Sequence, residues 1–344
     1  MPTKPNRAGQ QQSYVPAGNG DASGEYGDKS TGSNKHFTNF KKEDSAFESA
    51  NKQRLGSGLS SQPKVAEPIK ETSSAFDKWA HAIMTQERVG NPPEEIKVRV
   101  KDTPIERVDD DLINETIAKG YNPQTVGKAA ELLRKYEGSV DETAQDLENI
   151  ADNLGGMMVG MGFRLKRLGS MTRKLESYVI EEHEKGNTTF TIDDALGKMR
   201  DVARFTMCFD ENNFEGEVQK AMSKLERQGY KMVRAKNTFT EGASYKGLNC
   251  NFIDKKGNIF ELQFHVPNSM KIKEGIEVDL KNKRAVSNRR NITAHDLYET
   301  TRVIEDKMRQ NKATEEEKQL YNELTQEGKK RWATVPNFDF AFLK

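Results

Sequence analysis

The chain has 344 residues, of which 54 are Lys or Arg and 53 are Asp or Glu, so its net charge gives no reason to expect a nucleic-acid partner. The two cysteines, Cys208 and Cys250, lie in apolar stretches and lack the spacing of a zinc site. No segment approaches the ~20 apolar residues that span a bilayer, and the first residues lack the apolar core of a signal peptide. The sequence therefore predicts a cytoplasmic protein without a membrane partner.

Residues 1–72 are rich in Gly, Ser, Asn, Gln and Lys and contain almost no aliphatic side chains. Such a composition buries too little apolar surface to offset the entropy of an ordered chain, so we expect this region to be disordered. Within it, residues 12–25 resemble segments of phage minor head proteins and prophage toxins. That resemblance implies a bacterial or phage-encoded protein.

Residues 73–153 are expected to form a helical linker and module. A first helix carries Phe76 and Trp79 on one side. Three more helices are expected within residues 109–153, the third with a capping box that begins at Ser139. The pattern is similar to a ubiquitin-associated-type bundle, but a helical collar packed against the next domain is the favoured interpretation.

The main domain, residues 154–312, is expected to open with a glycine-rich apolar strand at 155–163. Residues 154–175 then contain five basic side chains and no acidic one. Basic groups at a strand end, followed by a helix capped by Ser170 or Thr172, form an anion site, because the helix N-terminus and the cations attract the same phosphate. The glycines match neither a Walker A loop nor a dinucleotide fingerprint.

Asp201 stands at the entrance of a predicted buried strand, residues 205–209, beside Arg200 and Arg204. Its position suits a functional carboxylate at a strand end. A surface aspartate in local ion pairs explains the same pattern equally well. The sequence around Asp201 therefore leaves both interpretations open.

Two apolar runs on either side of the turn at residues 255–258 alternate with a period of two, which predicts a β-hairpin. The alternation places Glu261, Gln263 and His265 on one face, and the intervening Leu and Phe toward the core. A solvent-exposed face is the simple alternative. A row of Glu, Gln and His is more typical of a site, because a solvated face favours Lys, Thr and Glu.

Residues 281–291 hold five basic side chains and no acidic one. We expect a loop there, which either contacts phosphate or is a solvated insertion. A helix is expected at 293–308. Residues 313–344 should form a C-terminal helix and an aromatic tail that packs back onto the domain.

The order of these motifs resembles the synthetase domain of the RelA/SpoT family over about residues 155–310. The motifs are the basic strand end, the aspartate at a strand start, Tyr245-Lys-Gly-Leu-Asn249, Glu-x-Gln on the partner strand, and a downstream Ala-His. Members of this family transfer pyrophosphate from ATP to the ribose 3′-hydroxyl of GDP or GTP. The resemblance implies an α+β fold with a nucleotidyltransferase-like mixed β-sheet flanked by helices. The His-Asp metal motif of the family's hydrolase half has no counterpart in residues 1–150, which implies a small synthetase, a toxin or an effector.

The resemblance also implies roles for individual residues. Those that would hold ATP and its phosphates are Arg164, Lys166, Ser170, Lys174 and Arg204. Those on the acceptor side are Tyr245, which would stack on the base, with Asn249, Gln263 and His265. Asp201 and Glu261 would bind Mg²⁺ and act in catalysis, Glu261 near the attacking hydroxyl. The downstream histidine matches His295.

The physical demands of the reaction agree with these roles. Pyrophosphoryl transfer needs charge neutralisation and in-line positioning more than covalent chemistry, and two carboxylates suit a hard cation such as Mg²⁺. Two positions depart from the family pattern. Asn249 replaces a histidine, and Asp201-Val-Ala-Arg204 is two residues shorter than the family's Asp-x-x-Gly-x-Arg and lacks its glycine.

Two other functions remain open at this point. The same fold would act on adenosine nucleotides or on the 3′ end of tRNA, which Asn249 and the basic stretch at 281–290 favour. The third interpretation is a non-catalytic, phage-associated interaction protein, which residues 1–72 favour. The leading hypothesis is transfer of pyrophosphate from ATP as the donor to GDP or GTP as the acceptor.

Overall fold

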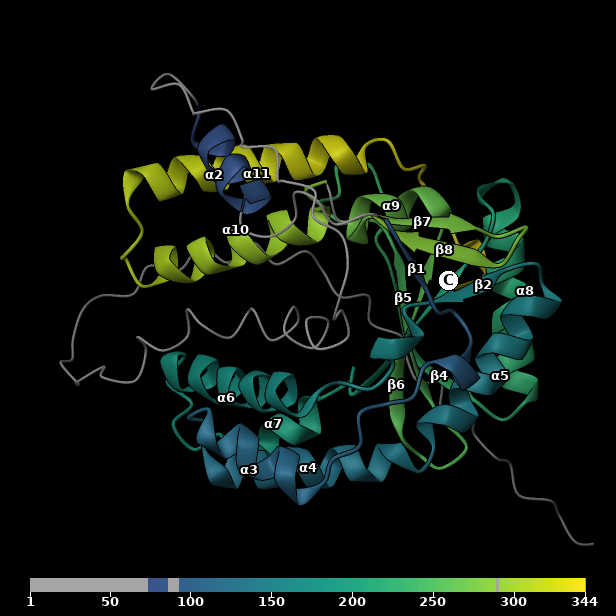
Figure 1. Ribbon diagram of the computed structural model, residues 1–344, viewed down its shortest axis with the longest axis horizontal. Coiled ribbons are helices and arrows are strands. Elements are labelled where there is room, and N and C mark those ends of the chain that lie inside the picture. The colour runs from purple at the N-terminus through teal and green to yellow at the C-terminus, as the bar shows by residue number, and fades with distance from the viewer. Residues whose placement is uncertain (1–73, 86–92, 289–290, 344) are drawn as a thin grey trace, which may run out of the picture. The chain divides into compact units, whose positions relative to one another are not determined.

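A computed structural model describes residues 74–85, 93–288 and 291–343, so the disorder expected for residues 1–72 lies outside it (Figure 1). Its main sheet has the strand order β2-β3-β6-β5-β4. The strands are β2 (Met157–Val159), β3 (Ala203–Cys208), β4 (Lys231–Asn237), β5 (Leu248–Ile253) and β6 (Ile259–His265). Strands β3 and β6 are parallel and the other neighbours are antiparallel. The sheet is therefore mixed and the α+β fold class is confirmed.

The predicted hairpin is strands β5 and β6. In its turn, the Asp254 carboxylate accepts hydrogen bonds from the amides of Lys256 at 2.9 Å and Asn258 at 2.7 Å. Gly257 has a φ of 85°, which a residue with a side chain rarely adopts. The turn fixes the register, and the register decides which side chains share a face.

The face of the sheet with the even-numbered residues of β5 and β6 is apolar. The helices α5 (Val140–Asn153) and α8 (Phe214–Arg227) pack with it into one continuous core. Val218 and Leu225 of α8 are fully buried. The rings of Phe252 and Phe260 stack with centroids 5.7 Å apart within this core. Each such side chain contributes roughly 1.5–3 kcal/mol by leaving water, so the polar face opposite is held by a rigid support.

The helical module contains α3 (Asp110–Ala118), α4 (Pro123–Glu137) and α5, and it shares the core of the sheet. The capping box predicted at Ser139 is wrong, because this N-cap residue makes no capping hydrogen bond with its side chain. Its hydroxyl instead accepts a hydrogen bond from Asn258 Nδ2 at 2.9 Å. The serine therefore joins the module to the hairpin turn.

Tyr136 of α4 makes a second link to the hairpin, because its buried hydroxyl donates to the Ile259 carbonyl at 2.8 Å. Burial raises the pKa of Tyr136 from 10.0 to about 12. A raised pKa stabilises the fold fully below pH 10.0, and this contribution is lost as the pH rises toward about 12. We expect Tyr136→Phe to lower the free energy of unfolding by about 1 kcal/mol at neutral pH.

Denaturant unfolding measured between neutral pH and pH 12 checks this prediction. The Tyr136→Phe variant should lose less stability over the alkaline range than the native protein does, because one titrating hydroxyl is gone. Tyr298→Phe, at an exposed ring, is the matched control and should change neither value. An alkaline loss of stability equal in the native protein and in Tyr136→Phe would contradict the assignment.

A second, three-stranded sheet has the order β1-β8-β7, with β1 (Glu94–Ile96), β7 (Ile276–Asp279) and β8 (Arg284–Ser287). The loop predicted for residues 281–291 is therefore partly wrong, since part of it forms β8. Lys283 Nζ donates to the Gly156 carbonyl, and Arg284 Nε lies 3.1 Å from Glu95. Two charges of the basic stretch thus already have partners within the protein.

The helices α2 (Ala75–Thr85), α10 (Ala294–Arg309) and α11 (Glu315–Trp332) form a separate apolar cluster (Figure 1). All three were predicted, and α2 is joined to α10 by a hydrogen bond of 3.1 Å from Trp79 Nε1 to Thr300. The predicted docking of the aromatic tail is also confirmed, with Phe338 packing on Phe214 at a centroid distance of 4.7 Å. Among the described residues, no helix is both long enough and apolar enough to cross a membrane.

Candidate active site

Two polar rows run across the main sheet on the face opposite the apolar core. The strand register aligns the members of each row and, because alternate residues share a face, the two rows lie side by side. The first row is Arg204, Glu261 and Asn251, and the second is Thr206, Gln263 and Asn249. Gln263 is only 5% exposed and His265 is 0% exposed, so this part of the face is buried, while Arg204 in the first row is exposed.

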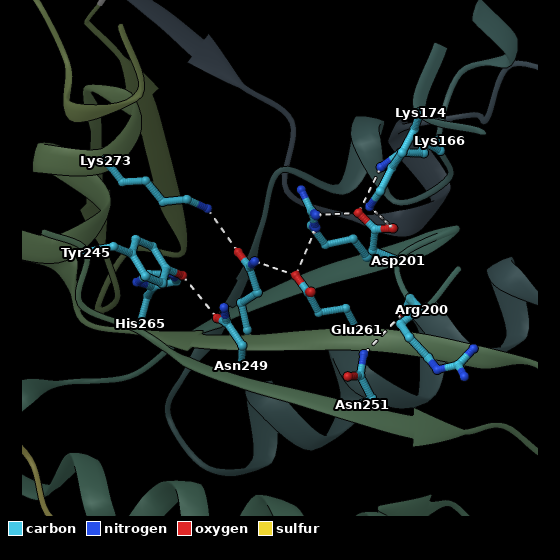
Figure 2. A network of polar contacts seen from close by, with 12 residues as sticks. Lys166, Lys174, Arg200, Asp201, Tyr245, Asn249, Asn251, Glu261, His265 and Lys273 are labelled. Carbon is cyan, nitrogen blue, oxygen red and sulfur yellow. Dashed lines mark hydrogen bonds and ion pairs between the residues drawn. The ribbon is translucent and has the colours of Figure 1, made fainter. Parts of the chain in front are cut away.

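Asp201 lies at the entrance of β3 and is 6% exposed. Its Oδ1 accepts a hydrogen bond from Lys174 at 2.7 Å, and its Oδ2 accepts from Lys166 at 3.0 Å and from Arg204 at 2.7 Å (Figure 2). Burial by itself raises the pKa of Asp201, but the three cations outweigh burial and hold the pKa well below its usual value. The carboxylate is therefore ionised and is the counter-charge of a cationic cluster.

The backbone explains why Lys166 reaches Asp201. Leu165 bridges Ala203 in antiparallel fashion, and the Lys166 amide donates to the Val202 carbonyl at 2.9 Å. This pairing lays the segment before α6 alongside the start of β3. The burial that results lowers the pKa of Lys166 despite the attraction of Asp201.

Helix α6 (Leu168–Glu184) begins earlier than predicted. Its N-cap is Arg167, so capping by Ser170 or Thr172 is wrong. Arg167 makes no capping hydrogen bond with its side chain, so this side chain satisfies none of the first-turn amides at the positive end of the helix dipole. Ser170 is exposed in this first turn and shares a helix face with Lys174, four residues on. The helix start and the lysines together form an anion-binding geometry.

Arg164 is not part of this cluster. It is 1% exposed, and its guanidinium donates to Asp141 at 2.6 and 2.9 Å, to the Met161 carbonyl at 2.7 Å and to Thr103. The cause is local, because the Arg164 backbone is helical (φ −64°, ψ −23°) at the end of the 3₁₀ turn Met161–Phe163. The alternation that would place it beside Lys166 is thereby broken.

Glu261 is connected to the Asp201 cluster through Arg204. Arg204 Nε lies 2.9 Å from Glu261 Oε1, and the other end of the same guanidinium contacts Asp201 (Figure 2). Gln263 Nε2 donates to the same Glu261 oxygen, and Gln263 Oε1 accepts from Lys273 at 2.9 Å. The cations of this network outnumber its two carboxylates, and they are Lys166, Lys174, Arg204 and Lys273. The net positive charge suits a polyanionic ligand.

The sequence did not point to Lys273. It lies on α9 (Pro267–Glu274), which starts directly after β6 and leads its side chain back to the polar rows (Figure 2). Burial lowers the pKa of Lys273, although Glu274 at 3.6 Å partly offsets this effect. Lysine can only donate and the Glu261 carboxylate only accepts, so both neighbours require the same orientation of the Gln263 amide. The direction in which α9 leaves β6 brings Lys273 to the site, and this direction has no signal in the linear sequence.

Tyr245 occupies the other end of the network and is half-buried. Its hydroxyl donates to Asn249 Oδ1 at 3.0 Å and lies 3.1 Å from His265 Nε2 (Figure 2). His265 Nδ1 lies 2.9 Å from Ser269 Oγ. Complete burial lowers the pKa of His265 well below its usual value, so the ring is neutral and supports Tyr245 from behind. A Cβ at Gly247 would lie 2.4 Å from the Tyr245 hydroxyl, which explains the glycine in the Tyr-x-Gly motif.

The last predicted residue, His295, is separate from the network. It lies in the first turn of α10, where its Nε2 is 3.8 Å from Glu299. The structure brings most of the predicted residues to one face of the sheet. Polar contacts join Lys166, Lys174, Asp201, Arg204, Glu261 and Gln263. Tyr245, Asn249 and His265 form a second group beside them, because Asn249 pairs with Gln263 in the sheet, and Ser170 lies in the first turn of α6.

Asp201 and Glu261 were also predicted to hold Mg²⁺. Within residues 74–85, 93–288 and 291–343, no group of three or more His, Cys, Asp or Glu side chains is arranged for a metal. Mg²⁺ binds nucleotide enzymes through one or two carboxylates, with water and substrate phosphates completing its shell. The two carboxylates, separated by Arg204, therefore fit a Mg²⁺ ion that arrives with a polyphosphate rather than one bound by the protein alone.

The sequence matches no protein-family model and no curated protein. Among solved structures, the chain is similar to the type VI effector Tas1, which was solved in complex with its immunity protein. This match has 18% identity and a TM-score of 0.35, and it covers 61% of this chain and 93% of that chain.

A second similar structure is the small alarmone synthetase 1 from Bacillus subtilis bound to its product pppGpp. It has 12% identity and a TM-score of 0.30, with 58% of this chain and 90% of that chain covered. At these identities and TM-scores, the activity of this chain has to be judged from its own residues.

Proposed function

We propose that this chain transfers a pyrophosphoryl group from ATP to the ribose 3′-hydroxyl of GDP or GTP. The observation that carries the proposal is the buried Asp201, which is held by three cations beside the Glu261 row. A single carboxylate with three cationic partners leaves positive charge to be balanced by a ligand. A nucleoside triphosphate supplies that balance.

On the donor side, the phosphates of ATP bind Lys166, Lys174 and Arg204 together with the first-turn amides of α6. This exchange of partners frees the Asp201 oxygens. Asp201 and Glu261 would hold a Mg²⁺ ion, which would supply further neutralisation of the charge on the transferred group. The cations and the helix dipole are fixed in place beforehand, so they stabilise that charge without reorganising.

On the acceptor side, the ring of Tyr245 holds the base and Glu261 accepts the proton of the 3′-hydroxyl. The new bond joins the acceptor oxygen to the β-phosphorus of ATP, and the bond between that phosphorus and the α-phosphate oxygen breaks to release AMP. Arg204 and Gln263 both bind one Glu261 oxygen, which leaves the other free to accept the proton.

Transfer from γ-labelled ATP to separate acceptors tests the proposal. We expect AMP release and label on GDP or GTP. Label on an adenosine nucleotide or on tRNA would instead favour the second acceptor class, for which Asn249 in place of histidine is the supporting observation. Absence of AMP release with every acceptor would contradict the proposal and favour a non-catalytic role.

Lys273→Met is expected to lower the transfer rate about tenfold, because the loss of a charge-assisted hydrogen bond frees the Gln263 amide to rotate away from Glu261. Lys273→Arg should restore part of the rate. Lys271→Met on the same helix is the matched control, since this exposed lysine pairs with Glu277 at 3.5 Å. Steady-state rates of AMP release measure the effect, and equal rates for the two methionine variants would contradict the assigned role.

A further inference from the structure

Lys246, next to Tyr245, is a buried cation that the proposed chemistry does not use. It is 3% exposed, and its ammonium donates to the Val335 carbonyl and to Asn337 Oδ1, both at 2.7 Å. Burial lowers the pKa of Lys246. Both oxygen atoms that accept these hydrogen bonds lie about ninety residues further along the chain, at Val335 and Asn337.

The same chain end contacts the Tyr245 loop at several other points. We call residues 332–340 the C-terminal segment. The Trp332 ring meets Tyr245 edge-on with a centroid distance of 5.4 Å. The Phe338 amide donates to the Phe239 carbonyl at 3.2 Å, and its carbonyl accepts from Asn237 Nδ2 at 2.7 Å. The segment therefore holds both ends of the loop at 238–247 that joins β4 to β5.

We propose that the C-terminal segment is a positioning element for the acceptor site and that Lys246 couples its docking to Tyr245. If the segment leaves, the Lys246 ammonium loses both of its oxygen partners in a buried place, and a buried cation without partners is unfavourable. The loop must then move to expose Lys246, and Tyr245 moves with its neighbour. The inference rests on the proposed function only in assigning the acceptor to Tyr245.

ATP binding on the donor side should not depend on whether the C-terminal segment is docked. Lys166, Lys174 and Arg204 are held by Asp201 and Glu261, on strand and helix positions fixed by the core. A ligand or partner that captured the C-terminal segment would therefore weaken binding of the acceptor nucleotide and leave ATP binding unchanged. The acceptor site is in this way linked to the last residues of the chain.

Asn337→Ala in the full chain tests the inference, because Asn337 is exposed and its loss does not threaten the fold. Undocking should raise the acceptor KM about tenfold, in inverse proportion to the fraction of protein in which the loop stays docked, with kcat and the KM for ATP within about twofold of native. Asn337→Asp keeps an oxygen acceptor for Lys246 and should leave the acceptor KM at or below the native value. Asn282→Ala is the matched control, since this exposed asparagine bonds Asp279 in the β7–β8 turn.

Hydrogen exchange of the amides at 238–247 gives a second readout that needs no activity. Exchange should be faster in Asn337→Ala and in Lys246→Met than in the native protein and the Asn282→Ala control. Unchanged exchange, or faster exchange with an unchanged acceptor KM, would overturn the inference. If the native protein transfers no label to any acceptor, the proposed function fails, and the exchange rates still decide whether the segment positions the loop.

Discussion

Asp201→Asn is expected to lower the transfer rate by about 10³-fold or more, because the variant loses both the counter-charge of the cluster and a carboxylate at the phosphates. It should also destabilise the ligand-free protein. Breaking a buried ion pair costs about 3–5 kcal/mol, and we expect about 2–3 here because Lys174 and Arg204 are partly exposed. Rates of AMP release and denaturant unfolding measure the two effects.

A polyphosphate should rescue the stability of this variant but not its rate. Bound ATP replaces the missing negative charge, so the melting temperature should rise more on adding ATP to Asp201→Asn than to the native protein. Asp193→Asn, which removes an exposed carboxylate paired with Lys128, is the matched control and should keep the native rate. A native rate in Asp201→Asn would remove the basis for the proposed site.

Glu261→Gln should lower the transfer rate by about 10²–10⁴-fold, the range for loss of a general base. ATP binding should persist, because Asp201 and its three cations stay in place. The isosteric amide cannot accept the hydroxyl proton, and it offers Arg204 and Gln263 a neutral oxygen in place of a carboxylate. Comparison of kcat with the dissociation constant of ATP separates the two effects.

Glu277→Gln provides the control for this variant. Glu277 is an exposed carboxylate on β7 that pairs with Lys271, and its loss should leave both values unchanged. A Glu261→Gln variant that retains the native kcat would show that another group accepts the proton. Loss of ATP binding together with kcat would instead assign Glu261 to the donor cluster.

The sequence predicted the parts of the site that follow from local rules. Alternation along β6 placed Glu261 and Gln263 on one face, and a glycine-containing turn fixed the hairpin register. Asp201 followed from its place before an apolar strand, where ion pairing and a functional role were equally consistent. The structure shows ion pairing with Arg204 nearby on β3 and with two distant lysines, Lys174 on α6 and Lys166 just before it, which local sequence does not encode.

The remaining features depend on where the folded backbone directs individual side chains. Arg164 was expected at the phosphates, but a helical backbone conformation at one residue turns it into the core. Lys273 reaches the site because α9 folds back over β6, and Lys246 is buried by residues far along the chain. Such contacts have large sequence separation and no periodic signal.

The departures from the family pattern also have structural counterparts. With two residues fewer between them, Asp201 and Arg204 still contact at 2.7 Å, and Arg204 reaches Glu261 with its other edge. Asn249 accepts a hydrogen bond from the Tyr245 hydroxyl. The shorter spacing is therefore compatible with the cluster. In the proposed acceptor site, Asn249 would influence which nucleotide Tyr245 holds.

Parallel reactions with β-labelled and γ-labelled ATP test pyrophosphoryl transfer most directly. If the chain transfers pyrophosphate, both labels move together to the acceptor and unlabelled AMP is the by-product. If it transfers a single phosphoryl group, only the γ-label moves and labelled ADP remains. Joint transfer of both labels to GDP or GTP is the predicted result, and ADP as the by-product, or labelled pyrophosphate free in solution, would contradict it.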